Sequence, residues 1–209
     1  MREKPIPPPT PGAIQGRGED AAADAPSAGA TSAAQLIPAW IDGVLTPVEK
    51  LAVHQRGLRH QAISIFVMRG GEVLLQRRAM SKYHTPGLWA NTVCTHPHWG
   101  ESHAACAVRR LDEELGITGL SLRRAGVVEY RAEVGGGMIE HEVVEVFTAA
   151  APLGLVVNPD PAEVKEIAWM EVDALAADCR RNAGRYTPWL RVYLGEHRDT
   201  IFGATATPF

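Results

Sequence analysis

Two hydrophobic periodicities alternate along the chain and predict its strands and helices. Residues 62–68 (AISIFVM) form an apolar, β-branched run typical of a buried strand, and Gly70-Gly71 turns the chain into a second strand over residues 73–77. Residues 36–45 predict a shorter strand pair, because Asp42-Gly43 is a favoured hairpin turn between two apolar segments. Both segments are therefore predicted to be antiparallel hairpins.

A helical period replaces the strand pattern after Ser102. Four apolar residues recur at helical spacing and form one predicted stripe: Ala104, Val108, Leu111 and Leu115. Ser102 is predicted as the N-cap of this helix and Gly116 as its C-cap glycine. The charged residues assigned to the opposite face are Arg109, Arg110, Glu113 and Glu114. Both Arg–Glu pairs have the i,i+4 spacing that is typical of a solvated, salt-bridged face.

A further hairpin is predicted around the Gly135–Gly137 turn, between strands over residues 127–133 and 138–149. Because side chains alternate along a strand, Glu140 and Glu142 share one face of the second strand. Two carboxylates two positions apart repel one another unless a cation lies between them. This pattern fits either an exposed sheet edge or a metal site.

The two ends of the chain differ from its centre. Residues 1–35 are rich in Pro, Ala and Gly and hold few large apolar side chains, so we expect a disordered N-terminal tail. Residues 201–209 are expected to form a short C-terminal tail. Between them, residues 36–200 are expected to form a single α/β (α+β) domain of mixed β-sheets flanked by helices, the last of which begins at Pro188.

Composition and charge narrow the classes of function. The chain has 209 residues, 45% of them hydrophobic, and a net charge of −3, which suits one packed domain and argues against a nucleic-acid partner. Its three cysteines are widely spaced, so no disulfide framework is indicated and a cytoplasmic location is expected. No apolar run reaches the ~18 residues of a membrane helix, and no Rossmann or Walker glycine pattern is present. We therefore expect no membrane association and no flavin or nicotinamide cofactor.

The stretch from Thr85 to Ile117 concentrates reactive chemistry. In TPGLWANTVCTHPHWGESHAACAVRRLDEELGI, an apolar segment leads into Cys94 and His96 and then into the charged helix face. A thiol, an imidazole and carboxylates around one turn are groups from which metal and proton-transfer sites are built. This stretch is therefore the candidate functional site.

The segment 95–117 resembles a Nudix box, G-x5-E-x7-R-E-U-x-E-E-x-G-U, where U is a bulky apolar residue. Seven residues match the pattern: Glu101, Arg109, Leu111, Glu113, Glu114, Gly116 and Ile117. Two depart from it, since Thr95 replaces the first glycine and Arg110 replaces the glutamate after the arginine. The wider string RRAMSK…PGLWANTVCTHP, followed by GES, resembles the type I isopentenyl-diphosphate isomerases, in which a Cys-x-His-Pro and a degraded Nudix box are the rule. This resemblance covers about residues 40–194.

The resemblance implies two metal sites and a diphosphate site. One divalent ion, Mn²⁺, Mg²⁺ or Zn²⁺, is expected on three imidazoles and two carboxylates: His54, His60, His96, Glu140 and Glu142. A Mg²⁺ ion that accompanies the substrate diphosphate is expected on Glu114 and the backbone carbonyl of Cys94. Cations at positions matching the family are expected to hold the diphosphate: Lys50, Arg78, Lys82 and Arg110. Taken singly, such histidines and cations are more often structural or surface residues.

The same resemblance implies the reaction. Isopentenyl and dimethylallyl diphosphate would interconvert through a tertiary carbocation, with Cys94 and Glu142 as the two proton-transfer groups and Tyr130 assisting Glu142. Trp189 would stabilise the cation through its aromatic face, although it can equally be a core residue. The expected partner is a small-molecule diphosphate, and the expected state is a monomer or weak homodimer.

Two other functions stay open. A Nudix hydrolase would cleave a diphosphate with a metal-activated water, but Arg110 stands where such an enzyme carries a metal-binding glutamate. A non-catalytic binding or scaffold protein would keep the fold without the reactive groups, and Cys94 and Glu142 are both present. The isomerase interpretation therefore accounts for more of the sequence.

Overall fold

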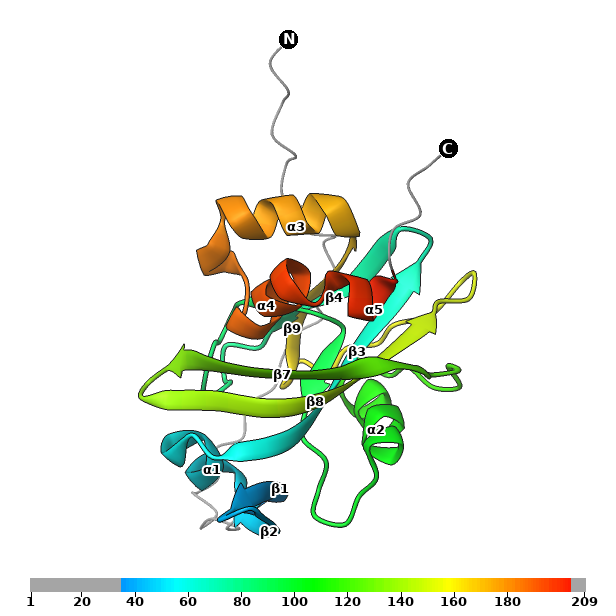
Figure 1. Ribbon diagram of the computed structural model, residues 1–209. Helices are drawn as coiled ribbons and strands as arrows, with labels where there is room; N and C mark the ends of the chain where they lie inside the picture. The colour runs from blue at the N-terminus through cyan, green and yellow to red at the C-terminus, as the bar shows by residue number, and fades with distance from the viewer. Residues whose placement is uncertain (1–34, 204–209) are drawn as a thin grey trace, which may run out of the picture. The chain divides into compact units, whose positions relative to one another are not determined.

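The computed structural model describes residues 35–203, so nearly all of the predicted N-terminal tail and residues 204–209 lie outside the described residues. In chain order the elements are β1 (Leu36–Ile41), β2 (Val44–Glu49), α1 (Lys50–Arg56), β3 (Arg59–Arg69), β4 (Glu72–Arg78), β5 (Trp89–Ala90), β6 (Val93–Thr95), α2 (His103–Leu115), β7 (Arg123–Gly135), β8 (Met138–Ala150), β9 (Val164–Glu171), α3 (Val172–Arg181), the 3-10 turn η1 (Ala183–Arg185), α4 (Pro188–Glu196) and α5 (Arg198–Phe202). Figure 1 shows this order by colour, from blue to red. The expected α/β architecture of mixed strands flanked by helices is confirmed.

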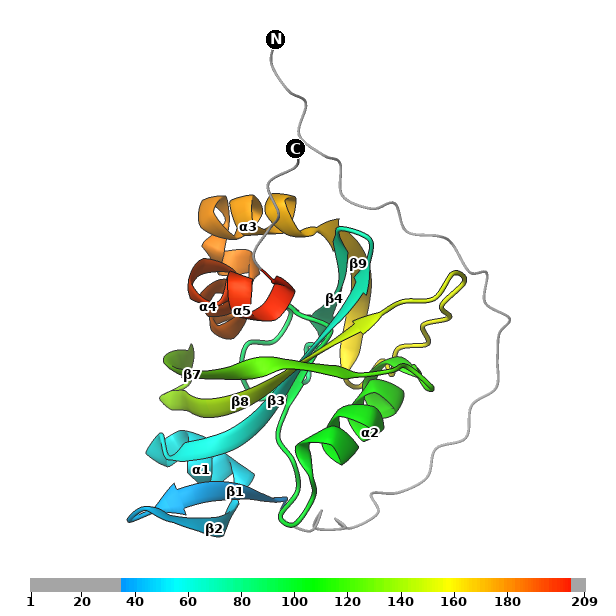
Figure 2. The ribbon, with the colours of Figure 1, turned by 45° about the vertical axis from the view of Figure 1, so that its right-hand side comes forward.

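Strand β3 connects the parts of the sheet, because different stretches of it pair with different neighbours (Figure 2). It forms hairpin contacts with β4, pairs with β1 at His60, and pairs with β6 where Ser64 lies opposite Cys94. Along most of its length β3 also runs parallel to β8, and this register places His60 beside Glu142. Residues far apart in sequence are thereby brought to one end of β3.

Both faces of β3 are buried, which explains its continuous apolar sequence. Ala62 and Phe66 point to a core shared with α3, α4 and α5, whereas Ile63 and Ile65 point to a second core shared with α2. Figure 1 shows these helices on opposite sides of the strands. An aromatic contact between Phe66 and Tyr193 of α4, with ring centroids 5.7 Å apart, joins the strand to the first helical layer.

Helix α2 has the predicted caps but not the predicted buried stripe. The Ser102 hydroxyl accepts a hydrogen bond from the Ala105 amide, and Gly116 ends the helix with a left-handed φ of 62°. Val108 is 55% exposed and Ala104 is also exposed, so their assignment to the buried face was wrong. The side chains that are buried instead are Cys106, Ala107, Leu111, Glu114 and Leu115. Glu114 is buried on this face with its carboxylate bound by the side-chain amide of Gln76 on β4.

The predicted hairpins are confirmed, and the strands extend further than expected. Asp42 and Gly43 both have positive φ in the turn between β1 and β2, and β7 pairs with β8 from Arg123 onward. The boundary of the predicted C-terminal tail was placed too early: Ile201 is fully buried and Phe202 ends helix α5, because both pack against the core that contains Phe66.

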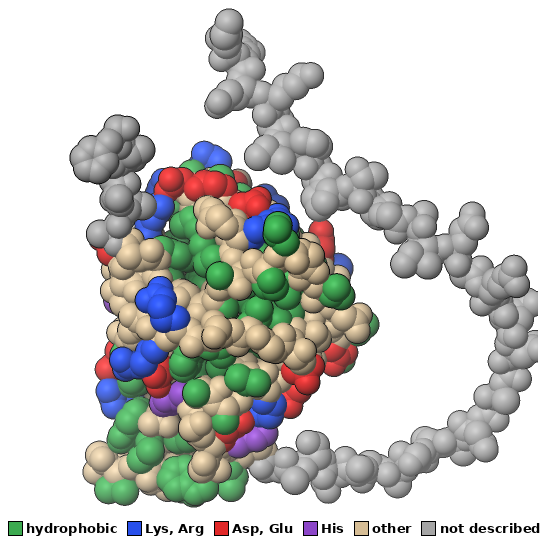
Figure 3. All heavy atoms as spheres, turned by 90° about the vertical axis from the view of Figure 1, so that its right-hand side faces the viewer, with side chains coloured by type: hydrophobic (Ala, Val, Ile, Leu, Met, Phe, Trp, Pro, Cys, Tyr) green, Lys and Arg blue, Asp and Glu red, His purple; other side chains and the backbone are tan. Residues whose placement is uncertain are grey.

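Two surface observations bear on possible partners. Among residues 35–203, no helix combines the length and the apolar character needed to cross a membrane. On the face shown in Figure 3, basic and acidic side chains are interspersed among apolar ones rather than separated by sign.

Candidate functional site

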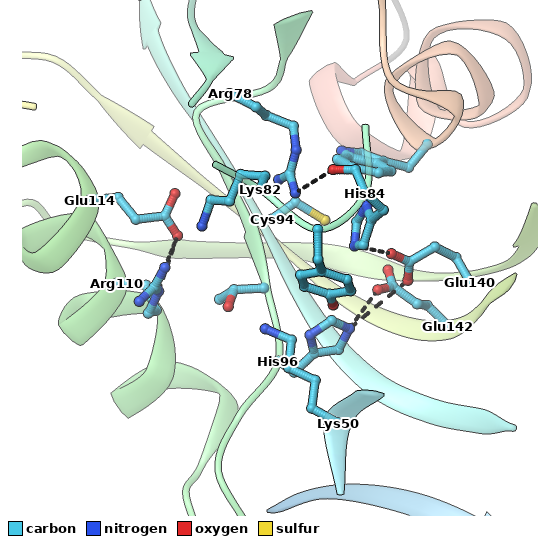
Figure 4. A pocket seen from close by; sticks show the side chains of 13 residues that line it. Lys50, Arg78, Lys82, His84, Cys94, His96, Arg110, Glu114, Glu140 and Glu142 are labelled. Carbon is cyan, nitrogen blue, oxygen red and sulfur yellow. Dashed lines mark hydrogen bonds and ion pairs between the residues drawn. The ribbon is translucent and has the colours of Figure 1, made fainter. Parts of the chain in front are cut away.

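A buried cluster of imidazoles and carboxylates forms where β3, β6, β8 and α1 meet. His54, His60, His96 and Glu140 each offer one ligand atom, and these atoms all lie within 4.8 Å of one another. Glu142, two positions along β8, adds Oε1 at 2.9 Å from Nε2 of His96 (Figure 4). All five side chains are buried, so the five metal ligands expected from the resemblance lie together in the structure.

The local backbone structure orients the imidazoles of His54 and His60 toward this cluster. Glu49 caps the short helix α1, which places Lys50 and His54 one turn apart on the same face. The helix ends at Gly57 with a φ of 60°, where a Cβ atom would lie 3.2 Å from the Ile139 side chain. Only glycine meets both conditions without strain. The helix therefore turns sharply into β3, where His60 follows.

Backbone carbonyls orient the same two rings. Nδ1 of His54 lies 2.6 Å from the Lys50 carbonyl oxygen, and Nδ1 of His60 lies 2.7 Å from the Leu58 carbonyl oxygen. A carbonyl can only accept, so each Nδ1 donates its proton, and each ring turns Nε2 toward the cluster. This is the outer support that metal-binding histidines usually have.

The separations within the cluster fit a divalent ion. Nε2 of His60 and Nε2 of His96 face each other at 3.1 Å, and Oε2 of Glu140 lies 3.5 Å from Nε2 of His54. Ligands bound at about 2.1 Å are roughly 3.0 Å apart when adjacent and 4.2 Å apart when opposite, which spans the observed values. Within residues 35–203, Nε2 of His54 and Oε2 of Glu140 are buried without a hydrogen-bond partner. Such atoms are costly unless an ion satisfies them.

The pKa values within the cluster also indicate that its two carboxylates need a compensating positive charge. Burial alone would raise the pKa of Glu142, but the nearby His60 ring, 3.7 Å away, and the hydrogen bond from Tyr130 bring it down to about 2. Burial lowers the pKa of His60, but the carboxylates of Glu140 and Glu142, each 3.7 Å from Nε2, outweigh burial and raise the pKa to about 10. Without a metal, one imidazolium therefore compensates two carboxylates, and a divalent cation can replace that proton.

Four cations line the cavity next to this cluster. Lys50, Arg78, Lys82 and Arg110 line one small cavity, and Figure 4 shows their side chains together with Cys94 and the two carboxylates of β8. Burial, together with the neighbouring charges of Arg110 and Lys82, lowers the pKa of Lys50. Glu163 forms ion pairs with both Lys82 and Arg110. The cations expected to hold a diphosphate are thus assembled in one place, and two of them already contact a carboxylate.

Glu114 lies at the edge of the same cavity and is fully paired. Its Oε1 accepts from Nε and Nη2 of Arg110 at 3.0 and 2.7 Å, and its Oε2 accepts from the Gln76 amide at 2.8 Å. Arg110 also reaches Glu113 at 2.8 Å. Arg110, expected to hold the diphosphate, therefore neutralises Glu114 in this structure. Gln76 was missed by sequence reasoning, although a polar residue within the apolar strand EVLLQRR is a recognisable signal.

Cys94 and Glu142 both line the cavity, with Tyr130 behind Glu142. Tyr130 lies opposite Glu142 in the β7–β8 pairing and donates its hydroxyl to Oε2 at 2.7 Å. Burial and then the negative charges of Glu142 and Glu140 raise the pKa of the Cys94 thiol well above its ordinary value. At neutral pH the site therefore holds a protonated thiol and an ionised carboxylate.

Trp189 is both a core residue and a neighbour of the cavity. It is 2% exposed in the helical core, and it also borders the cavity from the first turn of α4. The Arg78 guanidinium lies over its ring at 5.3 Å from the centroid. The indole therefore belongs to the core and to the wall of the site.

Three residues that border the site or its cations were missed: Tyr83, His84 and Glu163. His84 is 6% exposed, and its Nε2 lies 3.3 Å from Oε1 of Glu140. Burial lowers the pKa of His84 to about 3, so its ring is neutral. His84 lies two positions after Lys82, which was predicted to bind the diphosphate. A histidine so close to a predicted binding residue was the signal in the sequence that could have identified it.

Comparison with known proteins agrees with this geometry. Residues 58–190 match the NUDIX domain family. The isopentenyl-diphosphate Delta-isomerase of Rhodobacter capsulatus is 62% identical over 170 residues, which cover 81% of this chain and 97% of that protein. The enzyme of the same name from Dinoroseobacter shibae is 63% identical, over 82% of this chain and 98% of its own length.

Solved structures support the fold alone. A crystal structure of a Deinococcus radiodurans protein matches with a TM-score of 0.61 at 16% identity, over 77% of this chain and 96% of that one. A MutT NUDIX hydrolase from Burkholderia pseudomallei matches with a TM-score of 0.51 at 23% identity, over 65% and 95% of the two chains. The close sequence relatives are therefore the informative ones. With these matches across most of its length, the chain belongs to the isopentenyl-diphosphate Delta-isomerase family of NUDIX-domain proteins.

Proposed function

We propose that the chain interconverts isopentenyl and dimethylallyl diphosphate by adding a proton to one carbon of the substrate and removing a proton from another. The observation that carries this proposal is a single cavity that brings together Cys94, Glu142 and Trp189 with four cations. Cys94 and Glu142 can transfer protons to and from the hydrocarbon part of the substrate, whereas the four cations can bind its diphosphate. The close relatives named as isopentenyl-diphosphate Delta-isomerases support the same reaction.

The proton-transfer step would use Cys94 and Glu142. The raised pKa of Cys94 keeps a proton on the thiol, and the low pKa of Glu142 keeps its carboxylate ready to accept one. Tyr130 would hold Oε2 of Glu142 and so direct Oε1 toward the site. In the reverse direction the two groups exchange roles.

A carbocation formed between these groups must be kept from water. The site is buried, and Trp189 would present an aromatic face that attracts a cation. The Arg78 guanidinium beside this ring would contact the diphosphate. Substrate polarity would then fix which end enters the cavity first.

Divalent metal dependence follows from the family and from the cluster described above. His54, His60, His96, Glu140 and Glu142 would hold one ion, either Mn²⁺, Mg²⁺ or Zn²⁺. When bound, the ion would withdraw charge from the Glu142 carboxylate and replace the proton of His60. A Mg²⁺ ion that arrives with the diphosphate would use Glu114 and the Cys94 carbonyl, once Arg110 has shifted from Glu114 toward a phosphate oxygen.

The proposed partner is the small-molecule diphosphate alone. We continue to expect a monomer or weak homodimer in the cytoplasm, without a nucleic-acid or membrane partner. These expectations remain predictions.

The deciding experiment incubates the purified protein with isopentenyl diphosphate and Mg²⁺ or Mn²⁺, with and without a chelator. Dimethylallyl diphosphate and released phosphate are measured in the same samples. We expect the dimethylallyl product in the presence of metal, no product with chelator, and no released phosphate. Phosphate release without isomerisation would instead identify a hydrolase. Tight substrate binding with neither product would identify a binding protein.

A further inference from the structure

His84 lies within the site but has no part in the mechanism proposed above. It comes from the loop between β4 and β5, and its ring stacks on His54 with centroids 5.8 Å apart and an interplanar angle of 27°. Nε2 of His84 lies 3.3 Å from Oε1 of Glu140, and Nδ1 lies 3.1 Å from the Thr85 hydroxyl. A buried imidazole with a partner at each nitrogen has a fixed orientation.

The two oxygens of Glu140 face different groups. Oε1 meets His84, whereas Oε2 faces His54 at 3.5 Å and His60 at 3.7 Å. If the Thr85 hydroxyl donates to Nδ1, the proton of the His84 ring is on Nε2, and the ring donates to Oε1. The Glu140 carboxylate is then held at one oxygen and is available to a metal at the other.

We propose that His84 is a positioning residue for the metal site: its Nε2–H binds Oε1 of Glu140, so that Glu140 presents only Oε2 to the ion. A carboxylate can bind a metal through one or both oxygens, and a hydrogen bond to one oxygen selects the first mode. One-oxygen binding uses a single coordination position. The remaining position is then available to the second carboxylate on β8, Glu142.

The loop that carries His84 is built to keep this contact. Thr85 has a φ of 46°, a strained conformation for a β-branched residue, and it is buried. The His84 carbonyl accepts a hydrogen bond from Nη2 of Arg78 at 3.2 Å, and its ring meets Trp189 edge-on at 5.9 Å. The residue therefore touches the metal ligands, a diphosphate cation and the aromatic wall at once.

A direct-ligand role for His84 agrees less well with the geometry. The four ligand atoms that gather within 4.8 Å of one another come from His54, His60, His96 and Glu140. Nε2 of His84 faces the Glu140 oxygen that points away from those atoms. A ring nitrogen that donates to Oε1 has no lone pair for an ion.

The test compares His84→Gln, which retains an N–H donor of similar reach, with His84→Leu, which removes the donor and retains bulk. The matched control is His103→Leu, because His103 also bonds a glutamate, Glu145, at 2.6 Å but lies outside the cavity. Metal-stripped proteins are titrated with Mn²⁺ against a competing chelator. The Co²⁺-loaded proteins are compared by visible absorption, which reports ligand number and geometry.

We expect His84→Leu to weaken Mn²⁺ binding by roughly 10–100-fold and to alter the Co²⁺ spectrum, as loss of an outer-shell partner does. His84→Gln and His103→Leu should bind Mn²⁺ as the wild type does and keep its Co²⁺ spectrum. An unchanged affinity in His84→Leu would overturn the proposal. Equal losses in the Gln and Leu variants would also overturn it, because they would show that the imidazole itself is required as a ligand.

A second variant guards against misfolding of His84→Leu. Thr85→Val keeps the β-branched shape at the strained position but removes the hydroxyl that orients His84, so Mn²⁺ affinity should fall, though less than in His84→Leu. Unchanged affinity in this variant would count against the proposal. The inference rests on the proposed metal site but not on the isomerase reaction, because its readout is Mn²⁺ binding without substrate. Wild-type protein that bound no Mn²⁺ would refute the metal site itself, whatever the outcome of the product assay.

Discussion

Substitution of Arg110 separates the isomerase interpretation from the hydrolase one, because this residue stands where the Nudix pattern has a glutamate. Arg110→Ala should weaken binding of isopentenyl diphosphate and also destabilise the fold. Arg110→Lys should have a smaller effect, since it keeps the charge but loses the two-pronged contact. Arg110→Glu should have the largest effect, because it places another anion beside the substrate.

The magnitude follows from the contacts of the guanidinium. Two of its nitrogens bind Oε1 of Glu114 at 3.0 and 2.7 Å, and Glu114 is 4% exposed. Transferred to a phosphate oxygen, such a charge-assisted hydrogen bond contributes about 1.5–3 kcal/mol. At 1.4 kcal/mol for each tenfold change, the dissociation constant should rise roughly 10–150-fold. The contact between Arg110 and Glu113 lies at the surface and contributes at most about 1 kcal/mol to the free energy of unfolding.

Stability is affected through the carboxylate that is left behind. Without Arg110, Glu114 keeps only the amide of Gln76, and breaking a buried ion pair costs about 3–5 kcal/mol as an upper bound. Chemical denaturation measures this loss separately from binding. Isothermal titration with isopentenyl diphosphate and Mg²⁺ measures the affinity.

The control is Arg109→Ala, one residue earlier on α2. Arg109 binds Glu101 and Glu113 and lies outside the cavity, so its loss should leave the affinity unchanged. If Arg110→Glu bound the substrate as the wild type does, or if the wild type released phosphate, the reasoning given for Arg110 would be refuted.

Three further outcomes are expected. Cys94→Ala should lower the rate of isomerisation by at least the ~10²–10⁴-fold typical of acid–base groups, while folding and diphosphate binding persist. Near-normal turnover would remove the thiol from the mechanism. The control is Cys179→Ala, in the core, which should stay active. Glu140→Gln should lower the metal content of the histidine cluster, whereas Glu114→Gln should raise the Mg²⁺ concentration needed for substrate binding. If both variants lost the same single ion, the hypothesis of two separate metal sites would be wrong. Metal-free protein should release about one proton per ion bound at pH 7–8, because His60 is protonated below its pKa of about 10. Raising the pH removes that competing proton, so ion affinity should increase up to about pH 10; a pH-independent affinity would contradict the assignment.

Local signals in the sequence predicted the hairpins and helix ends but not how the elements pack. The turn at Asp42-Gly43 and the cap at Ser102 are encoded by neighbouring residues, and both are confirmed. On α2, Val108 is exposed and Glu114 is buried, and the partner of Glu114, Gln76, lies 38 residues away in the sequence. Periodicity within the helix contains no information about that partner.

The candidate site divides in the same way. The thiol, the metal ligands and the four cations were recognised from family motifs, and the structure brings them together. Glu163 was missed because its partner Lys82 is 81 residues away. His84 was missed because only the fold shows that Glu140 turns one oxygen toward it.

The parallel pairing of β3 with β8 has a consequence for how the protein is made. The metal ligands come from segments that leave the ribosome at different times: His60 precedes His96 by 36 residues, and His96 precedes Glu142 by 46. Parallel strands with such long connections form late in folding, because loop closure must precede any gain from their contacts. A nascent chain that exposes only its histidines therefore cannot assemble the complete coordination sphere. Tight metal retention would mark molecules that have completed folding, and the bound ion would then stabilise that final state by mass action.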